Sequence, residues 1–371
     1  MRILQLGKFW PILGGVEKVM YDLASGLAAR GVECDMLCAV AQGGAQEIPL
    51  YGCGRVMAVP TLLTARSTMI SPAMAVRLRR IADGYDIIHV HHPDPMAALA
   101  LRLSGYKGRV VLHWHSDILR QRVLLKAYRP LQGWLLDRAD RVICTSPLYA
   151  AGSRELRRVD HKLECVPIGI APVVPDSVAA AEWKFRLGGR KVVFALGRLI
   201  PYKGFDNLIL AARRLPDDYV TVIAGSGPLR NRFARLIAEN GLEDRVMLAG
   251  RVSDEDRDAL LGAASVFVLP SVEKTEAYGI VLIEAMSAGV PVVATRIPGS
   301  GTSWVNAHGV SGLNVECNDP DALARAIVDV VDREKDPRAF ARNARRRWEE
   351  MFTIDAFIDR VIGIYRSLLH E

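Results

Sequence analysis

The sequence predicts an α/β protein with two parallel β-sheets, each covered by helices. Short apolar strands alternate with helices whose apolar residues recur with a period near 3.6, and this alternation occurs twice along the chain. A proline-rich stretch with little periodicity, 167–175, separates the two halves. Because 371 residues suffice for two cores, we expect one domain over 1–170 and a second over 178–350.

The first half begins with a strand at 2–7, a loop containing Gly14 and Gly15, and a helix at 16–30 that is apolar on one side. A strand at 33–40 completes a βαβ unit. Two adjacent glycines before a helix let the backbone approach a ligand closely, although a plain turn explains them equally well. The alternation then continues with further expected strands and helices at 73–82, 85–90, 96–104, 109–113, 118–137, 141–146 and 163–166.

The second half repeats the pattern from a strand at 191–197. The later expected strands and helices lie at 205–215, 219–224, 229–240, 246–248, 254–263, 266–269, 290–295, 312–315 and 321–331, and the chain ends in helical sequence. Repeated βα units in both halves favour two parallel sheets with helices on their faces.

Composition narrows the class of protein. The chain has no apolar run long enough for a transmembrane helix, no signal-peptide pattern, and six cysteines without a CxxC pair, so we expect free thiols and a cytoplasmic protein. Residues 1–175 carry 22 Lys and Arg against 14 Asp and Glu, whereas the remainder carries 26 against 27. The basic first half favours contact with an anionic membrane surface or a phosphorylated acceptor. We expect no nucleic-acid partner and rank it last, because the chain has no basic repeat with interleaved aromatics and no nucleic-acid motif.

The loop after the first strand of the second half, 198–204, carries Arg198 and Lys203 ahead of Gly204. Two long cations at the carboxyl end of a parallel strand suit a diphosphate, with Arg as a planar fork and Lys as a point charge. This loop is therefore a candidate anion site.

The stretch 270–289 predicts a polar loop followed by a short buried helix that ends at Gly289. A helix N-terminus suits an anion. If Glu276 and Glu284 are both near-helical, they are separated by about 12 Å of rise and lie on nearly one side. They would then hold two sets of hydroxyls with a diphosphate between them. The alternative is that Glu276 only caps the helix and Glu284 pairs with a neighbouring base.

Five histidines between residues 89 and 115 raise the question of a metal. Their spacing on two expected strands distributes alternate side chains over both faces, and no HExxH pattern is present. We therefore predict no metal site and one functional histidine, His115, the last before the loop. Two strings of alternating aspartates, at 254–258 and 319–321, lie at helix starts and are interpreted as caps.

Taken together, these motifs resemble the retaining GT-B glycosyltransferases of family 4, also called group 1. The resemblance rests on the GG loop, His115, GRLxxxKG at 197–204, AGxGP at 224–228, and Glu-x7-Glu at 276–284 followed by AMSAGVPVVAT. It covers nearly the whole chain. Trp304 stands before Val305 where the family pattern usually has Glu, so no phosphate-binding role is carried over to 298–305.

The resemblance implies two Rossmann-like domains that face a cleft, a last helix (about 353–371) that crosses back onto the first domain, and metal-independent transfer with retention. It implies that Arg198 and Lys203 neutralise the diphosphate, that Glu276 holds sugar hydroxyls, and that Glu284 holds the ribose. The remaining donor-site positions implied are Gly14, Gly15, Arg251, Val252, Ala277, Tyr278, Gly279 and Ile280, with His115 contacting the sugar.

Within this family, the amino-acid sequence looks most similar to mannosyl- and rhamnosyltransferases of bacterial surface-polysaccharide and lipopolysaccharide synthesis. The expected donor is a GDP- or UDP-linked hexose, mannose-like, and the expected acceptor is a glycan or a lipid-linked glycan. Peripheral contact with the inner face of the membrane is the matching location. The alternative is a catalytically inactive module that only binds a nucleotide sugar.

Overall fold

The computed structural model describes residues 1–12, 14–40, 43–50, 52–65, 68–119, 122–332, 336 and 338–371. The chain divides into two compact units. Unit 1 comprises Met1–Gly169 together with Ile354–Glu371, and unit 2 comprises Ile170–Thr353. All six cysteines are free thiols. None of the helices in the described ranges is both long enough and apolar enough to cross a membrane.

Unit 1 contains an eight-stranded sheet of order β10-β9-β8-β7-β1-β2-β4-β3 and a separate β5–β6 hairpin. All neighbouring strands in the large sheet run parallel except β3, which is antiparallel to β4. The strands are β1 (Arg2–Trp10), β2 (Glu33–Val40), β3 (Gln46–Leu50), β4 (Gly54–Val59), β5 (Leu63–Ala65), β6 (Thr68–Ile70), β7 (Ile87–His92), β8 (Arg109–Trp114), β9 (Arg141–Cys144) and β10 (Leu163–Cys165).

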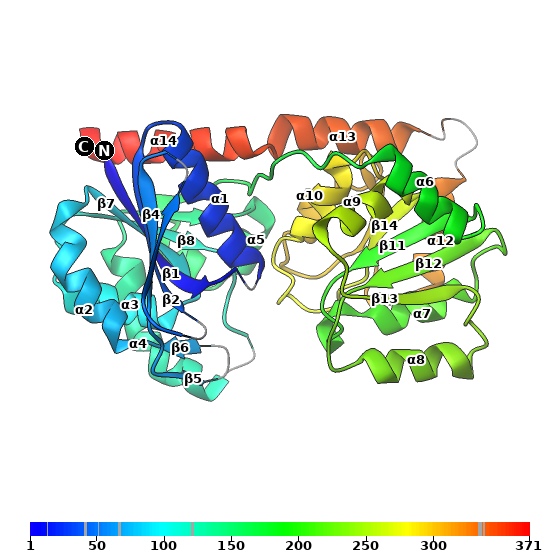
Figure 1. Cartoon of the computed structure of the whole chain (residues 1–371), viewed down its shortest axis with the longest axis horizontal. Helices are drawn as coiled ribbons and strands as arrows, with labels where there is room; N and C mark the ends of the chain where they lie inside the picture. Colours follow the sequence, from blue (N-terminus) through cyan, green and yellow to red (C-terminus); the bar gives the residue numbers. More distant parts are fainter. Residues whose placement is uncertain are drawn as a thin grey trace. The chain divides into compact units, whose positions relative to one another are not determined.

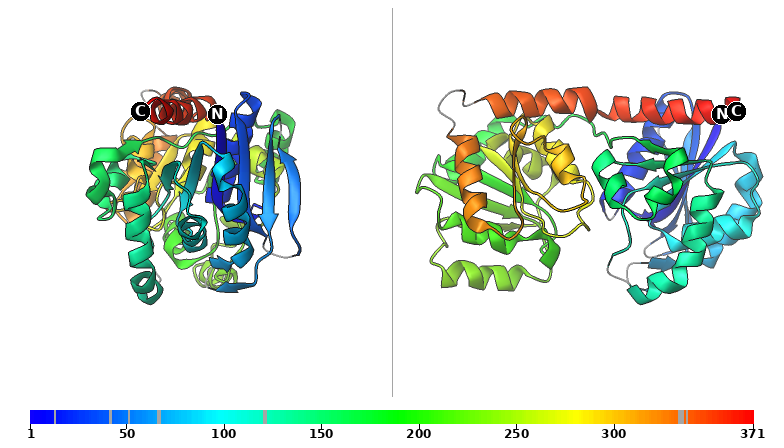
Figure 2. Two further views of the ribbon diagram at one scale, coloured as in Figure 1. Left: turned by 90° about the vertical axis from the view of Figure 1, so that its left-hand side faces the viewer. Right: turned by 180° about the vertical axis from the view of Figure 1, so that it is seen from behind.

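Helices cover both faces of this sheet (Figure 1). The helix α1 packs against the C-terminal helix α14, where Ile358 fills the space beside Gly26. The helices α2, α3 and α4 pack side by side on the other face (Figure 2). The helices of unit 1 are α1 (Gly15–Ala29), α2 (Pro72–Ile81), α3 (Pro95–Ser104), α4 (Arg122–Arg138), α5 (Pro147–Gly152) and α14 (Ile354–His370). The expected helix at 118–137 therefore begins later, and its residues 120–121 lie outside the described ranges.

Unit 2 contains a six-stranded parallel sheet of order β13-β12-β11-β14-β15-β16. The strands are β11 (Lys191–Leu196), β12 (Tyr219–Ala224), β13 (Val246–Gly250), β14 (Val266–Leu269), β15 (Val292–Thr295) and β16 (Gly312–Val315). The helices are α6 (Ser177–Arg186), α7 (Phe205–Ala212), α8 (Arg230–Glu239), α9 (Asp254–Ala263), α10 (Ile280–Ser287), α11 (Thr302–Val305), α12 (Pro320–Val331) and α13 (Ala339–Met351). The β-branched strands are buried on both faces, as expected for a parallel sheet between helices.

The two candidate anion-binding loops of unit 2 follow two neighbouring strands, β11 and β14. They pair in register through Val193 with Val266 and Phe194 with Phe267. Because they are parallel, their carboxyl ends lie at the same edge of the sheet. The loops that leave this edge are 197–204 and 270–279, the two loops that carry the candidate anion-binding residues.

Candidate active site

Gly204 brings the two loops of unit 2 together. It follows a short 3₁₀ turn, Pro201–Lys203, and has φ of 63°, in the left-handed region that favours glycine. A Cβ at Gly204 would lie 2.1 Å from the backbone oxygen of Pro270. The Val272 N–H donates to the Tyr202 carbonyl oxygen at 2.8 Å. Only glycine fits at position 204, and the close approach that it allows positions Lys203 over the second loop.

Lys203 and Glu276 form an ion pair between these loops. The Lys203 Nζ lies 2.6 Å from the Glu276 Oε2, and the two side chains are only 10% and 12% exposed. Burial alone would lower the pKa of Lys203, but the neighbouring Glu276 and Tyr202 outweigh it, so the pKa is raised. Lys203 is therefore a charged ammonium in a largely dry site, and its two other N–H groups remain for a ligand.

Two serines fix Glu276, and neither was predicted from the sequence. The Ser271 hydroxyl donates to the Glu276 Oε2 at 3.0 Å, and the Ser300 hydroxyl donates to the Glu276 backbone oxygen. The Gly301 N–H donates to the Ala277 oxygen at 2.8 Å. The segment 298–305, to which no role was carried over, thus holds the backbone of the second loop in place. The Glu276 Oε1 makes no hydrogen bond within the described part of the chain and remains free to accept one.

The condition that Glu276 and Glu284 are both near-helical is not met, whereas the polar loop predicted before the helix is present. The helix α10 begins at Ile280, and Gly279 before it has φ of 82°, so Glu276 belongs to the loop. Glu276 makes no cap either, because the N-cap residue is Gly279 and no side chain caps α10. A left-handed glycine interrupts the helical path, so the rise estimated from sequence spacing does not apply. Ala277 and Tyr278 are buried in the same loop.

Glu284 lies inside α10 and is half-buried. Burial lowers the pKa of the Arg257 guanidinium, but the charges of Glu284, Asp258 and Asp254 outweigh this effect, so the Arg257 pKa is raised. Glu284 is thus close enough to Arg257 to interact with it. This interaction agrees with the pairing with a base that the sequence left open as the alternative, and ribose binding by Glu284 stays a prediction.

Arg198 is the exposed cation at this edge. Among the residues that the structure describes, its guanidinium makes no ion pair and no hydrogen bond. Its positive charge opposes protonation of Lys203, so the two cations are neighbours. The turn that presents Arg198 packs against the next loop, where a Cβ at Gly225 would lie 1.9 Å from the Gly197 oxygen. The Gly225 N–H also donates to the Gly250 oxygen at 2.6 Å, which places the turn before Arg251 and Val252 beside this loop.

In unit 1, the last part of strand β1 contains a buried lysine, Lys8, that sequence reasoning missed. Strand β1 continues through the expected loop as far as Trp10, with an irregularity between Leu6 and Phe9. At that irregularity Lys8 has φ of 65°, and its Nζ donates to the Pro93 oxygen at 2.5 Å. Burial lowers the pKa of Lys8, although the Asp94 and Glu17 carboxylates partly restore it. The sequence signal that could have identified Lys8 is its position directly after Gly7, at the end of the expected strand.

Gly14 and Gly15 lie at the start of α1, which begins one residue earlier than predicted. Gly15 is the first helical residue and Gly14 is the extended N-cap residue. A Cβ at Gly14 would lie 2.8 Å from the Glu17 Oε2. The absence of a side chain at Gly14 therefore accommodates the buried Glu17 carboxylate.

The histidines of unit 1 are arranged differently from the prediction. His91 on β7 pairs with His113 on β8, so His89, His91, His113 and His115 all lie on one face and stack with ring centroids 4.1–5.5 Å apart. His92 and Trp114 lie on the opposite face, where His92 contacts Gln132. Residues at positions i and i+2 of a strand share a face, and the register of two parallel strands unites both pairs.

Hydrogen bonds fix the tautomers along this face. Gln5 Nε2 donates to the Tyr365 hydroxyl at 3.1 Å, which leaves the Gln5 Oε1 to accept from His91 Nε2 at 2.8 Å. Burial lowers the pKa of both His91 and His115 well below the ordinary value, so each ring is neutral and carries one proton. The His91 Nδ1 is then an acceptor, and His115 Nε2 donates to it at 2.9 Å.

Three histidines of this face are close enough together to be considered as metal ligands. Nitrogen atoms of His89, His91 and His113 lie within 4.8 Å of one another. However, the three rings are stacked with interplanar angles of 8–29°. Lone pairs lie in the ring plane, so stacked imidazoles direct them side by side rather than toward one point. That no metal is required stays a prediction.

Comparison with known proteins identifies the family. Residues 180–347 match the family "Glycosyl transferases group 1", and residues 13–173 match "Glycosyltransferase Family 4". The O-antigen chain mannosyltransferase C of Escherichia coli is 34% identical over 377 residues, with both chains fully covered. The chain belongs to the group 1, family 4 glycosyltransferases. The D-rhamnosyltransferase WbpZ of Pseudomonas aeruginosa is 33% identical and covers 95% of this chain and 92% of its own.

The fold of this glycosyltransferase is GT-B. The crystal structure of Anabaena Alr3699/HepE in complex with UDP superposes with a TM-score of 0.78 at 20% identity, and the match covers 99% of this chain and 100% of that one. The two parallel sheets and their helical layers are those expected of two Rossmann-like domains.

The aspartate strings of this glycosyltransferase are helix-start residues. Asp319 accepts from the Ala322 N–H at 2.8 Å and caps α12, as predicted. At α9 the cap is Ser253 rather than an aspartate, and Arg257 pairs with Asp254 and Asp258, each at 2.8 Å. The carboxylates of both strings thus have local structural partners.

Proposed function

We propose that this glycosyltransferase moves a hexose, mannose-like, from a nucleoside-diphosphate sugar to a glycan or lipid-linked glycan, with retention of anomeric configuration. The observation that carries the proposal is the buried Lys203–Glu276 pair at the carboxyl edge of β11 and β14, with the exposed Arg198 beside it. Cations and a hydroxyl-binding carboxylate adjoin one another there, as a sugar diphosphate requires.

Lys203 and Arg198 would bind the diphosphate. Lys203 is held in one position by Glu276 and contributes a buried positive charge, whereas Arg198 is free to approach two phosphate oxygens as a fork. As the diphosphate leaves, negative charge grows on its oxygen, and preorganised cations in a water-poor site stabilise that charge most effectively. The first turn of α10 would add its N–H groups to the same anion.

Glu276 would bind the sugar. Its Oε2 is occupied by Lys203 and Ser271, which leaves Oε1 to accept from a sugar hydroxyl. A carboxylate fixed in this way is a poor candidate for a covalent nucleophile, which supports transfer on one face of the sugar rather than double displacement. Because two protein cations face the diphosphate, we propose that no metal is required.

The relatives support the choice of sugar and acceptor. A mannosyltransferase of O-antigen chains and a D-rhamnosyltransferase are each a third identical to this chain over nearly its full length. We therefore propose a mannose-like sugar and an acceptor from surface-polysaccharide synthesis. The basic charge of residues 1–175 supports a cytoplasmic protein that contacts the inner face of the membrane peripherally.

A transfer assay with product analysis tests this proposal. The purified enzyme is offered GDP-mannose, GDP-rhamnose or UDP-glucose, with a mannoside acceptor that bears an alkyl chain. The anomeric configuration of the product is read from the one-bond NMR coupling between C1 and H1 of the transferred sugar. We expect a mannose-like donor to be used and an α-donor to give an α-product. An inverted product would refute retention. Nucleotide binding without turnover of any donor would favour the inactive binding module.

A further inference from the structure

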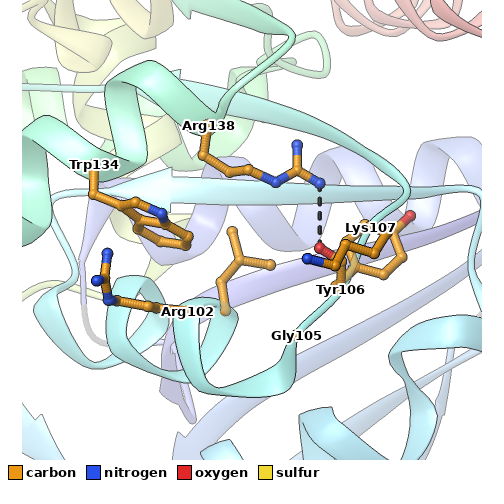
Figure 3. A pocket seen from close by; sticks show the side chains of 7 residues that line it. Arg102, Gly105, Tyr106, Lys107, Trp134 and Arg138 are labelled. Atoms are coloured by element: carbon orange, nitrogen blue, oxygen red, sulfur yellow. Dashed lines mark hydrogen bonds between the residues drawn. The ribbon is translucent and has the colours of Figure 1, made fainter.

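One pocket of unit 1 is lined by basic and aromatic side chains (Figure 3). Its volume is about 390 Å³. Figure 3 shows Arg102 beside the indole of Trp134 at one end and Arg138 with Lys107 at the other. The lining residues are Leu101, Arg102, Gly105, Tyr106, Lys107, Trp134 and Arg138, a set with three cations and no carboxylate.

The pocket lies at the opposite edge of the sheet from His115. The helices α3 and α4 end at Ser104 and Arg138, and the strands that follow them, β8 and β9, begin at Arg109 and Arg141. The pocket is thus at the amino edge of these strands, whereas His115 follows the carboxyl end of β8. It is a separate site from His115, the candidate sugar-contacting residue of the same unit.

Two of its three cations have no acidic partner. Arg138 donates to the Tyr106 and Gly108 carbonyl oxygens and pairs with Asp140 at 3.4 Å. Arg102 instead lies over the Trp134 ring, with its guanidinium carbon 5.2 Å from the centroid. Within the described ranges, neither Arg102 nor Lys107 makes an ion pair. A pocket with an excess of positive charge and flexible donors at two ends fits a phosphate group.

Stabilisation of helix ends does not account for the whole arrangement. Arg102 and Arg138 lie in the last turns of α3 and α4, where cations complement the helix dipole. Lys107, however, lies in the loop beyond α3 and is exposed. It adds a third cation to the pocket lining that no helix end accounts for.

The surface next to Arg102 is apolar. Leu99 and Leu103, one turn apart on α3, are 39% and 54% exposed. Leu99, three residues before Arg102, is its neighbour on the helix surface, and Leu103 is in turn the neighbour of Leu99. Exposed leucines beside a cation-lined, tryptophan-walled pocket match the boundary between lipid headgroups and acyl chains, where tryptophan and arginine are favoured.

We propose that this pocket binds the phosphate headgroup of an anionic membrane phospholipid, with Leu99 and Leu103 contacting the acyl region. Arg102 and Lys107 supply the charges, Trp134 forms the wall, and Arg138 closes the far end. The pocket would dock unit 1 on the membrane by its strand-amino edge. This proposal does not depend on the identity of the sugar donor.

Vesicle co-sedimentation tests the pocket. The full-length enzyme is mixed with phosphatidylcholine vesicles that contain or lack phosphatidylglycerol, at about 0.1 M salt. We expect binding only to the anionic vesicles. The variant Arg102→Gln/Lys107→Gln should bind about 30-fold more weakly, the change that follows from about 1 kcal/mol for each basic residue near the surface.

A matched control removes the same charge elsewhere. The variant Arg235→Gln/Arg325→Gln takes two exposed arginines from unit 2 and should keep full binding. Leu103→Ser should weaken binding by about tenfold in a salt-independent way, because it removes apolar contact.

Three outcomes would overturn the proposal. Equal loss in the two double variants would show that only net charge matters. Undiminished vesicle binding by Arg102→Gln/Lys107→Gln would show that the pocket is not involved. Calorimetric binding of soluble glycerol phosphate at this pocket, without vesicle binding, would identify a free phosphate ligand instead of a lipid. The variants carry substitutions at exposed positions, and circular dichroism checks that they fold.

Discussion

The Lys203 ammonium lies 2.6 Å from the Glu276 carboxylate, and this contact joins the loop after β11 to the loop after β14. Both side chains are nearly buried, so each charge depends on the other for its solvation. The pair therefore has two consequences. It preorganises a cation and a carboxylate for a ligand, and it makes each residue structurally important.

The first prediction concerns the stability of this pair. Lys203→Met should destabilise unit 2 by about 3 kcal/mol because it leaves the Glu276 charge without its partner. Glu276→Leu should have a similar effect on Lys203. The double variant Lys203→Met/Glu276→Leu should cost about 1–3 kcal/mol less than the sum of the two, since no unpaired charge remains. Urea denaturation of the four proteins measures this coupling, and additive losses would argue against it.

The pH dependence of the same pair has a defined sign. The pKa of Lys203 is raised in the folded protein above its ordinary value of 10.5. A base whose folded pKa is raised contributes stability below the unfolded pKa and loses it as the pH rises through the folded value. The difference in unfolding free energy between the wild type and the double variant should thus be constant from about pH 7 to 9. The contribution of the pair to the wild type should be lost only above about pH 10.5. A gap that narrows in the neutral range would contradict the assignment.

A second prediction uses two glycines with nearly the same backbone angle. Gly204 and Gly189 have φ of 63° and 68°, but a Cβ would meet the Pro270 oxygen at 2.1 Å only at Gly204. At Gly189 nothing lies within 4 Å. Gly189→Ala should cost about 1 kcal/mol from backbone strain, whereas Gly204→Ala should cost several times more. Thermal melts of both variants provide the comparison, and equal costs would show that the loops can separate freely.

A third prediction concerns His113. Both of its ring nitrogens are buried without a hydrogen-bond partner in the described structure, and burial lowers its pKa to about 3. Below its ordinary pKa of 6.5 the unfolded chain takes up a proton that the folded protein does not. This residue therefore destabilises the fold as the pH falls from about 6.5 toward 3, by about 1.4 kcal/mol per pH unit.

His113→Phe should remove that penalty. We expect the gain in stability over the wild type to be larger at pH 5 than at pH 8, because phenylalanine takes up no proton when the chain unfolds. Thermal melts across this pH range measure the difference. His308→Phe, at a histidine of unit 2 that is not buried, is the control and should not reduce the acid sensitivity. An unchanged pH slope in His113→Phe would disprove the neutral, buried state.

A fourth prediction is the tautomer of His115. The chain of hydrogen bonds from Gln5 through His91 requires that His115 carries its proton on Nε2. Nitrogen-15 NMR of the imidazole rings distinguishes the protonated from the unprotonated nitrogen. In Gln5→Leu the His91 ring loses its acceptor, so the His115 signals should shift. A His115 ring that carries its proton on Nδ1 in the wild type would contradict this series of hydrogen bonds.

The sequence predicted the parallel sheets and the loops that carry charge because both depend on local patterns. The period of the apolar residues and the glycines at loop ends are sufficient to place 198–204 and 270–279 at strand ends. By contrast, sequence separation could not give the relation of Glu276 to Glu284, because a single left-handed residue, Gly279, redirects the chain.

Contacts between distant segments also could not be predicted from the sequence. Ser300 reaches the Glu276 backbone across 24 residues, and Tyr365 reaches His89 across 276 residues. No periodicity encodes such pairings, since they arise from the register and order of strands. The shared face of the four histidines depends likewise on the pairing of His91 with His113.

The most direct test of the proposed function is nucleotide binding and sugar transfer by Arg198→Ala. Arg198 is exposed and without an ion pair in the described structure, so its removal should leave the melting temperature unchanged. We predict that GDP or UDP, whichever stabilises the wild type, binds at least tenfold more weakly and that transfer falls about 100-fold or more. Arg235→Ala, an exposed arginine of the same unit, should behave as wild type. Wild-type binding and transfer by a folded Arg198→Ala would contradict the diphosphate site.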